Sequence, residues 1–327
     1  MEIATTARVV SVTRENAGER LDLLLRRRLA DVHRISRTRV QRWIDDGQVS
    51  MNGLLVRSAS TRPTHGAVVV VQLPVEAPRP PMAAEPMALD VLFEDDLWLA
   101  VNKPAGLVVH PTYKHSSGTL LNGLLWRARS WPRGQRPSLV GRLDRLTSGV
   151  VLVAKTGAAH ARLQQALGKG ESQKDYLALV YGRVRERQGR IDLPLGRDPR
   201  DARRVAVAVA GATSLTRFER LAAVAAPKAG LSLLRCRLVT GRTHQIRVHL
   251  AARGWPIVGD PVYGEPRWSS IVDLERAAGL RAFPRQALHA WRVTLPPLVG
   301  AGRPTIEAPL PADFDNLMSA NRLPRSW

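Results

Sequence analysis

Cysteine, acidic residues and long apolar runs are scarce in this sequence of 327 residues. The single cysteine, Cys236, excludes an intramolecular disulfide and a cysteine-rich zinc site, and it fits a reducing compartment. The most apolar stretch, residues 221–234, is interrupted by Pro227, Lys228 and Gly230, so we do not expect it to cross a bilayer. No basic region followed by an apolar run marks the N-terminus, and we expect no signal peptide. These absences predict a cytoplasmic protein.

The scarcity of acidic residues leaves a large positive charge. Lys and Arg number 49 against 28 Asp and Glu, a formal net charge of +21, and Arg supplies most of the excess. Guanidinium groups bind phosphate oxygens in pairs and stack on bases. The composition therefore favours a nucleic-acid partner, ahead of an anionic membrane surface or a basic surface without a ligand. The chain length is typical of a folded protein with two domains.

Residues 19–73 predict a compact basic domain that contains two helices and a small β unit. Leucines recur at helical spacing in the first helix, and Ser36 is a good N-cap for the second. The Asn52-Gly53 pair between short apolar runs predicts a hairpin. Exposed arginines on the second helix suit a grip on an RNA backbone, and we expect RNA contacts from Arg37, Arg39 and Arg42.

This region resembles the S4 RNA-binding domain. The resemblance rests on Arg20, Leu21, Asp22, Ser36, Arg37, Gln41, Ile44, Gly47, Val49, Asn52, Gly53 and Gly66. It implies that residues 1–75 form an RNA-binding domain. The resemblance thus indicates RNA as the ligand but does not indicate which reaction the protein catalyses.

A proline-rich stretch over residues 74–86 predicts an extended linker, which we place at 76–88. The second domain then runs over residues 89–327. Its strands come in clusters with short helices between them, which predicts an α+β fold with a largely antiparallel sheet. We expect strands at 91–93, 98–101, 150–154, 176–182, 231–239, 257–263 and 287–295, and helices at 119–128, 158–167 and 244–253.

One short stretch in this domain carries an unusual arrangement of charges. Asp144 lies between Arg142 and Arg145, just before the apolar strand expected at 150–154. The neighbouring cations would keep the carboxylate ionised, and an ionised, positioned carboxylate can act as a nucleophile or a general base. Taken alone, the pattern is more typical of a turn held by salt bridges.

Three further motifs change that interpretation. Together with RLDRLTSG at 142–149, the chain carries NKPAG at 102–106, KDYLALVYG at 174–182 and TGRTHQIRVH at 240–249. In this order and spacing the domain resembles the RluA-type pseudouridine synthases, RNA enzymes that isomerise uridine to pseudouridine. The resemblance implies a catalytic domain with a largely antiparallel mixed sheet flanked by helices.

The resemblance also implies roles for single residues. Asp144 matches the essential aspartate, Tyr176 the aromatic residue that stacks on the extruded uracil, and Arg247 the arginine that pairs with the carboxylate. Arg142 matches a residue that contacts RNA and displaces the base. The sequence departs from the family at Gly141, where many members carry His, and at a second position, which is often polar and is Leu146 here.

The chemistry of these residues agrees with those roles. A base inside folded RNA must leave its stack before it can react, and stacking on an aromatic ring returns about 1–3 kcal/mol. The reaction involves neither a redox change nor phosphate transfer, so we expect no cofactor and no metal. We also expect RNA contacts from Arg142, Arg145, Arg242, His244 and Gln245.

The sequence thus predicts a monomeric, cytoplasmic RNA pseudouridine synthase. Its expected substrate is large-subunit ribosomal RNA, followed by transfer RNA. The alternative is a non-catalytic RNA-binding or ribosome-assembly factor, which the intact set of Asp144, Tyr176 and Arg247 argues against. The first step stays open between attack of Asp144 on C1′, attack on C6, and removal of a sugar proton.

Overall fold

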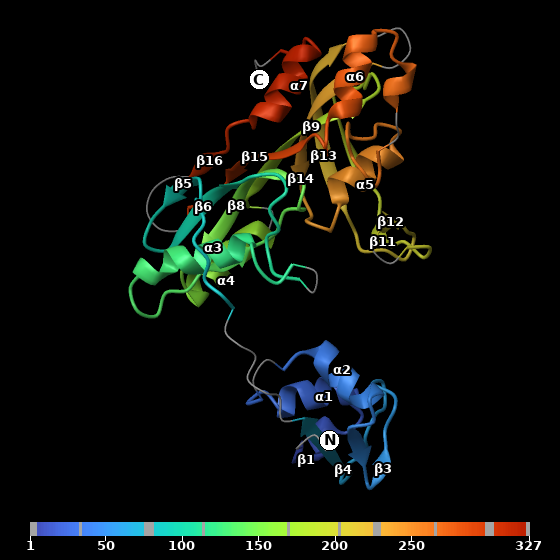
Figure 1. The fold of residues 1–327 in the computed structure, drawn as a ribbon. Helices are drawn as coiled ribbons and strands as arrows, with labels where there is room; N and C mark the ends of the chain where they lie inside the picture. The colour runs from blue at the N-terminus through green and yellow to red at the C-terminus, as the bar shows by residue number, and fades with distance from the viewer. Residues whose placement is uncertain are drawn as a thin grey trace. The chain divides into compact units, whose positions relative to one another are not determined.

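The computed structural model describes residues 5–32, 35–74, 82–112, 115–168, 171–201, 204–224, 230–264, 267–297 and 304–324. The chain divides into two compact units, Met1–Pro81 and Met82–Trp327 (Figure 1). Each unit buries its own hydrophobic core. Within the described ranges, no helix combines the length and the apolar character that a membrane span requires.

The first unit packs two helices against a four-stranded sheet. Its helices are α1 (Leu21–Arg28) and α2 (Arg37–Asp45), preceded by a short 3-10 turn, η1 (Arg14–Asn16). The strands are β1 (Thr5–Ser11), β2 (Val49–Met51), β3 (Leu54–Leu55) and β4 (Val68–Pro74), in the antiparallel order β1-β4-β2-β3.

Local sequence explains the connections in this unit. The Ser36 hydroxyl accepts a hydrogen bond from the Arg39 backbone N–H and caps α2, as predicted. Asn52 and Gly53 have φ angles of 51° and 83°, the left-handed pair that a tight hairpin turn requires. The apolar face of α2 is buried with the leucines of α1. Strand β1 was not among the expected elements.

The second unit is built on one large sheet. Its strands are β5 (Val91–Glu94), β6 (Trp98–Lys103), β7 (Ser138–Val140), β8 (Ser148–Ala154), β9 (Gln173–Tyr181), β10 (Gln188–Asp192), β13 (Leu215–Val224), β14 (Leu231–Leu238), β15 (Leu288–Thr294) and β16 (Thr305–Glu307). A separate hairpin joins β11 (Leu195–Arg197) and β12 (Val205–Val207). The helices are α3 (Leu120–Arg127), α4 (Gly157–Gly168), α5 (Gln245–Ala252), α6 (Leu274–Ala282) and α7 (Ala312–Ala320), with 3-10 turns η2 (Ala128–Ser130) and η3 (Arg267–Ser270).

The sheet is mixed and largely antiparallel, which confirms the predicted fold class. Its order is β10-β13-β14-β9-β15-β8-β6-β5, with β7 added on β8 and β16 on β15. Only the β8–β15 pair is parallel among the strand pairs of the described residues. Helices α3 and α4 lie beside the part with β6 and β8, whereas α5 lies beside β13 and β14 (Figure 1). The sheet thus brings β8 and β9, which carry two of the motifs, to either side of β15.

Two expectations need correction. The strand expected at 257–263 is a turn, in which only Ile257 makes an isolated bridge to Val180. The Asp260 carboxylate accepts the backbone N–H groups of Val262 and Tyr263, so these donors are satisfied within the turn and not in a ladder.

The predicted linker at 76–88 also changes. Its later part is hydrogen-bonded to the second unit. The Asn122 side-chain amide on α3 donates to the Ala83 carbonyl, and the Glu85 carboxylate accepts the Gly118 N–H. Residues 75–81 lie outside the described residues. Residues 82–88 of the predicted linker thus belong to the second unit.

Candidate active site

The loop between β7 and β8 presents Asp144 at the surface of the second unit. It begins at Gly141, whose φ of 90° favours glycine. It leads into β8, whose second residue, Gly149, has a φ of 116°, and a Cβ atom there would lie 2.1 Å from the Ala290 carbonyl oxygen on β15. Only glycine permits this approach of the two strands, so the site depends on backbone that other residues cannot adopt.

Lys103, at the end of β6, holds this loop through a hydrogen bond to the Arg145 carbonyl. Its side chain is fully buried, and Nζ donates hydrogen bonds to the carbonyls of Pro104, Leu107 and Arg145 at 2.7, 2.9 and 3.0 Å. Burial and the Arg285 guanidinium lower the pKa of Lys103 to about 7, and the nearby Asp144 carboxylate opposes the shift. Because three acceptors surround Nζ, the geometry suits the protonated ammonium.

A second clamp comes from the segment before β15. Gln286 Nε2 donates to Thr147 Oγ1 at 3.0 Å. Arg285 is buried and binds the Asp313 carboxylate of α7 with two hydrogen bonds of 2.6 and 2.8 Å. The loop with Asp144 is therefore held on both sides by buried groups.

The Asp144 carboxylate pairs with Arg247 on α5. Nη1 of Arg247 donates to Oδ2 of Asp144 at 2.9 Å. Nε and Nη2 of the same guanidinium donate to Oδ2 and Oδ1 of Asp260, at 2.7 Å each. The Asp260 side chain is fully buried, that of Arg247 is 5% exposed, and that of Asp144 is 19% exposed. The three side chains form a carboxylate–guanidinium–carboxylate chain whose outer end alone reaches solvent.

Two aromatic rings complete the wall around Arg247. The Tyr263 ring lies 5.0 Å from the Arg247 guanidinium carbon, and its hydroxyl lies 2.9 Å from His244 Nδ1. His244 has a φ of 55° at the start of α5, and its Nε2 lies 3.8 Å from Asp144 Oδ1. Burial lowers the pKa of His244, with the Asp144 carboxylate opposing, so the neutral imidazole is favoured at neutral pH.

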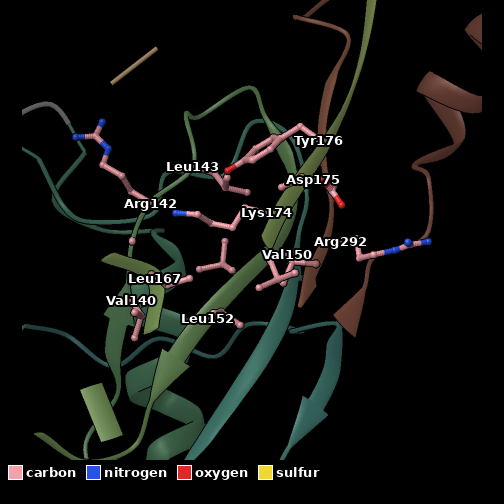
Figure 2. Close-up of a pocket in the computed structure, with 14 residues that line it drawn as sticks. Val140, Arg142, Leu143, Val150, Leu152, Leu167, Lys174, Asp175, Tyr176 and Arg292 are labelled. Atoms are coloured by element: carbon pink, nitrogen blue, oxygen red, sulfur yellow. The ribbon is translucent and has the colours of Figure 1, made fainter. Parts of the chain in front are cut away.

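Tyr176 lies on β9 and borders the same region. Burial, and then the Asp144 carboxylate, raise the pKa of Tyr176, so its phenol stays protonated. The ring lines a small cavity together with Arg142 and Leu143 from the loop (Figure 2). The structure thus pairs Asp144 with Arg247 and places Tyr176 near enough for the carboxylate to influence the pKa of its phenol.

The remaining expected RNA contacts divide into two groups. Arg142, Arg145 and Arg242 are exposed on loops of the second unit. Neither Arg142 nor Arg145 is ion-paired with Asp144 among the described residues, so the cations next to it in sequence do not neutralise it; Arg247 does. His244 faces Asp144, as described above.

Gln245 differs from its expected role. It is 2% exposed, and its amide oxygen accepts from Thr240 Oγ1 and the Arg242 N–H while its amide nitrogen donates to the Leu215 carbonyl and Thr216 Oγ1. The geometry does not support an RNA contact, because the side chain closes the loop before α5.

The expected cations of the first unit lie on α2. Arg37 Nε donates to the buried Asp22 carboxylate at 2.8 Å, and Arg39 lies 5.2 Å from the Trp43 ring centre. Arg42 is exposed. Arg37 is thus tied to Asp22, although 48% of its side chain is exposed.

Sequence reasoning missed Asp260, Tyr263 and the clamp formed by Arg285. No local pattern marks Asp260, which stands within an apolar run that resembles a strand. Its partner Arg247 is on a helix, and only the tertiary structure brings the two together. The Gly-Asp-Pro order at 259–261 was the available sign of a turn in place of a strand.

Comparison with known proteins gives one consistent result. A family model described as RNA pseudouridylate synthase matches residues 97–252. An RNA pseudouridine synthase of Bacillus subtilis, YlyB, is 38% identical over 318 residues, which cover 94% of this chain and 96% of the relative. The ribosomal large subunit pseudouridine synthase D of Pseudomonas aeruginosa is also 38% identical, over 97% of both chains.

The structural comparison agrees with the sequence comparison. The solved structure of human RNA pseudouridylate synthase domain containing 1 matches with a TM-score of 0.54 and 27% identity. The match covers 72% of this chain and 90% of the human chain.

Proposed function

The chain belongs to the RNA pseudouridylate synthase family and isomerises uridine in RNA to pseudouridine, and we propose that its substrate is large-subunit ribosomal RNA and its catalytic carboxylate Asp144. The relative from Pseudomonas aeruginosa, similar over nearly its whole length, is named for the large ribosomal subunit. The net charge of +21 suits a large, structured RNA.

The ion pair between Asp144 and Arg247 is the observation that carries the catalytic assignment. Arg247 binds Oδ2 of Asp144 and is itself fixed by the buried Asp260. Oδ1 has no hydrogen bond among the described residues, and His244 Nε2 lies 3.8 Å from it. One oxygen is anchored and the other faces the reacting atoms, which suits a nucleophile or base.

In this site the uridine leaves its stack and lies against Tyr176. Asp144 then starts the reaction by attack on C1′, by attack on C6, or by removal of a sugar proton. Each route needs the carboxylate ionised, and the Arg247 guanidinium cannot lose its charge. The bond from C1′ to N1 breaks, the base turns, and C1′ bonds to C5, with a proton lost from C5 and one gained at N1.

The rest of the RNA is held by cations outside this centre. In our proposal Arg142, Arg145 and Arg242 contact phosphates near the target, and Arg39 and Arg42 of the first unit hold a separate part of the RNA. Such contacts fix position and carry no base specificity. We expect the protein to act as a monomer in the cytoplasm.

The test uses unmodified transcripts of large-subunit ribosomal RNA and of transfer RNA, each incubated with the full chain and mapped for pseudouridine by chemical labelling. Pseudouridine at defined positions of the ribosomal transcript alone is the expected result. Product only in transfer RNA would contradict the substrate proposal. Asp144→Asn, which keeps the size of the side chain, should abolish product while RNA binding persists; wild-type turnover by this variant would contradict the role of Asp144.

A further inference from the structure

Lys174 and Tyr176 lie on the same face of β9. Successive strand residues point to opposite faces, so positions 174 and 176 lie on one side and Asp175 on the other. Asp175 is bound by two hydrogen bonds of 2.8 and 3.1 Å from Arg237 on β14. Lys174, Asp175 and Tyr176 all contribute to the lining of one cavity, together with Arg142 (Figure 2).

The Lys174 ammonium has no acidic partner among the described residues. Its Nζ lies beside Gly241, where a Cβ atom would be 3.7 Å away, at ordinary van der Waals distance. The side chain is only partly exposed, and burial lowers the pKa of Lys174. A partly desolvated cation without a counter-charge is costly, and such a group in a cavity that Tyr176 also lines is a candidate for function.

The shape of the cavity selects the ligand. Its volume is about 60 Å³, and its lining combines apolar side chains, among them Val150 and Leu152 of β8, with charged ones that include Arg292 of β15. This volume holds about four waters, which suits the edge of a flat base and not a phosphodiester with two riboses attached. A base stacked on Tyr176 would turn its polar edge toward the same face.

We propose that the Lys174 ammonium is a catalytic group that donates a hydrogen bond to a carbonyl oxygen of the target uracil. The inference rests on the proposed function. When the bond from C1′ to N1 breaks, its electron pair stays on N1 and the negative charge spreads onto O2 and O4. When a carboxylate adds to C6, the electron pair of the ring double bond moves toward O4. Negative charge reaches a carbonyl oxygen in either case, and an ammonium fixed in a site with little water stabilises it.

The experiment compares Lys174→Met, which keeps the length and removes the charge, with Lys174→Arg, which keeps the charge. The control is Arg190→Met, which removes an exposed cation from β10 at the edge of the sheet. Each full-length variant is assayed with enzyme in excess over a transcript on which the wild type forms pseudouridine. The rate of a single turnover, the RNA dissociation constant and its salt dependence are measured, together with the melting temperature.

Lys174→Met should slow the single turnover by about 100-fold or more, the usual effect of removing one donor to a developing oxyanion. RNA affinity and its salt slope should stay at the wild-type values. Lys174→Arg should recover part of the rate. A fourth variant, Lys174→Ala, shortens the side chain, and added ethylammonium should raise its rate. Arg190→Met should turn over at the wild-type rate.

Three results would overturn the proposal. The first is an unchanged single-turnover rate in Lys174→Met. The second is an unchanged rate with weaker binding and a salt slope lower by about one, which marks a phosphate contact. The third is a lower melting temperature with no recovery by arginine or ethylammonium, which marks a structural role. Failure of the proposed function is seen separately, because it would leave the wild type inactive on ribosomal RNA or Asp144→Asn active.

Discussion

Asparagine in place of Asp260 should lower both the stability and the activity of the protein. Asp260 is fully buried and accepts two hydrogen bonds of 2.7 Å from Arg247. Asparagine keeps the shape and one carbonyl oxygen but loses the charge, so Arg247 is left partly uncompensated. Removing one partner of a buried ion pair costs about 3–5 kcal/mol, and the retained oxygen places this change near 3 kcal/mol.

Thermal unfolding of the full chain measures this cost. For a unit of this size 1 kcal/mol corresponds to about 2–4 °C, so the transition of the second unit should fall by roughly 6–12 °C. Asp96→Asn, at the exposed turn between β5 and β6, is the matched control and should leave the transition in place. Because Arg247 positions Asp144, single turnover by Asp260→Asn should also slow by about 100-fold, the scale expected when a catalytic group shifts by about 1 Å.

The pH dependence gives a sharper check. Arg247 and the N–H groups of the turn hold the pKa of Asp260 below its ordinary value of 3.8, against the opposing effect of burial. A lowered pKa gives stability that is present above pH 3.8 and is lost as the pH falls toward the folded-state value. The wild type and Asp260→Asn should therefore converge in melting temperature below pH 4. A constant difference, or a variant that melts and turns over like the wild type, would refute the reasoning.

Three other changes test the supports of the site and the RNA grip. Lys103→Met removes the donor to three partly buried carbonyls, of which only that of Arg145 also accepts the Gly106 N–H among the described residues, and this should cost about 1–3 kcal/mol and slow turnover; unfolding and single-turnover assays would contradict this if both match the wild type. Gly149→Ala forces a Cβ atom to 2.1 Å from the Ala290 carbonyl oxygen, so little folded protein is expected, and a soluble variant with a wild-type melting curve would count against the close approach. The double change Arg39→Gln and Arg42→Gln should weaken RNA binding and lower the salt slope by about two, one for each phosphate contact, and an unchanged slope would place the RNA elsewhere.

The sequence predicted the parts of the fold that follow local rules. The apolar runs, the capping Ser36 and the Asn52-Gly53 turn act through neighbouring residues, and the structure has the corresponding helices, strands and hairpin. The prediction of a strand at 257–263 was wrong, because hydrophobicity alone does not indicate whether the backbone N–H groups donate to a neighbouring strand or to a side chain. There a side chain, Asp260, takes the bonds that a ladder would have taken.

The motif order determined the reaction class, because the four motifs together resemble one enzyme family and the comparisons confirm that family. The ion pairs were decided by tertiary structure. Arg142 and Arg145 flank Asp144 in sequence yet form no ion pair with it among the described residues, while Arg247, more than a hundred residues away, binds it.

Charge in a folded protein is balanced across space and not along the chain. The sequence by itself established which chemical groups are available and which local elements carry them. The tertiary structure decided which cation neutralises Asp144, that Asp260 holds this cation, and that Lys174 is left without an acidic partner among the described residues. The reason is that these contacts join strands and helices distant in sequence, and their energies depend on burial that only the packed sheet creates.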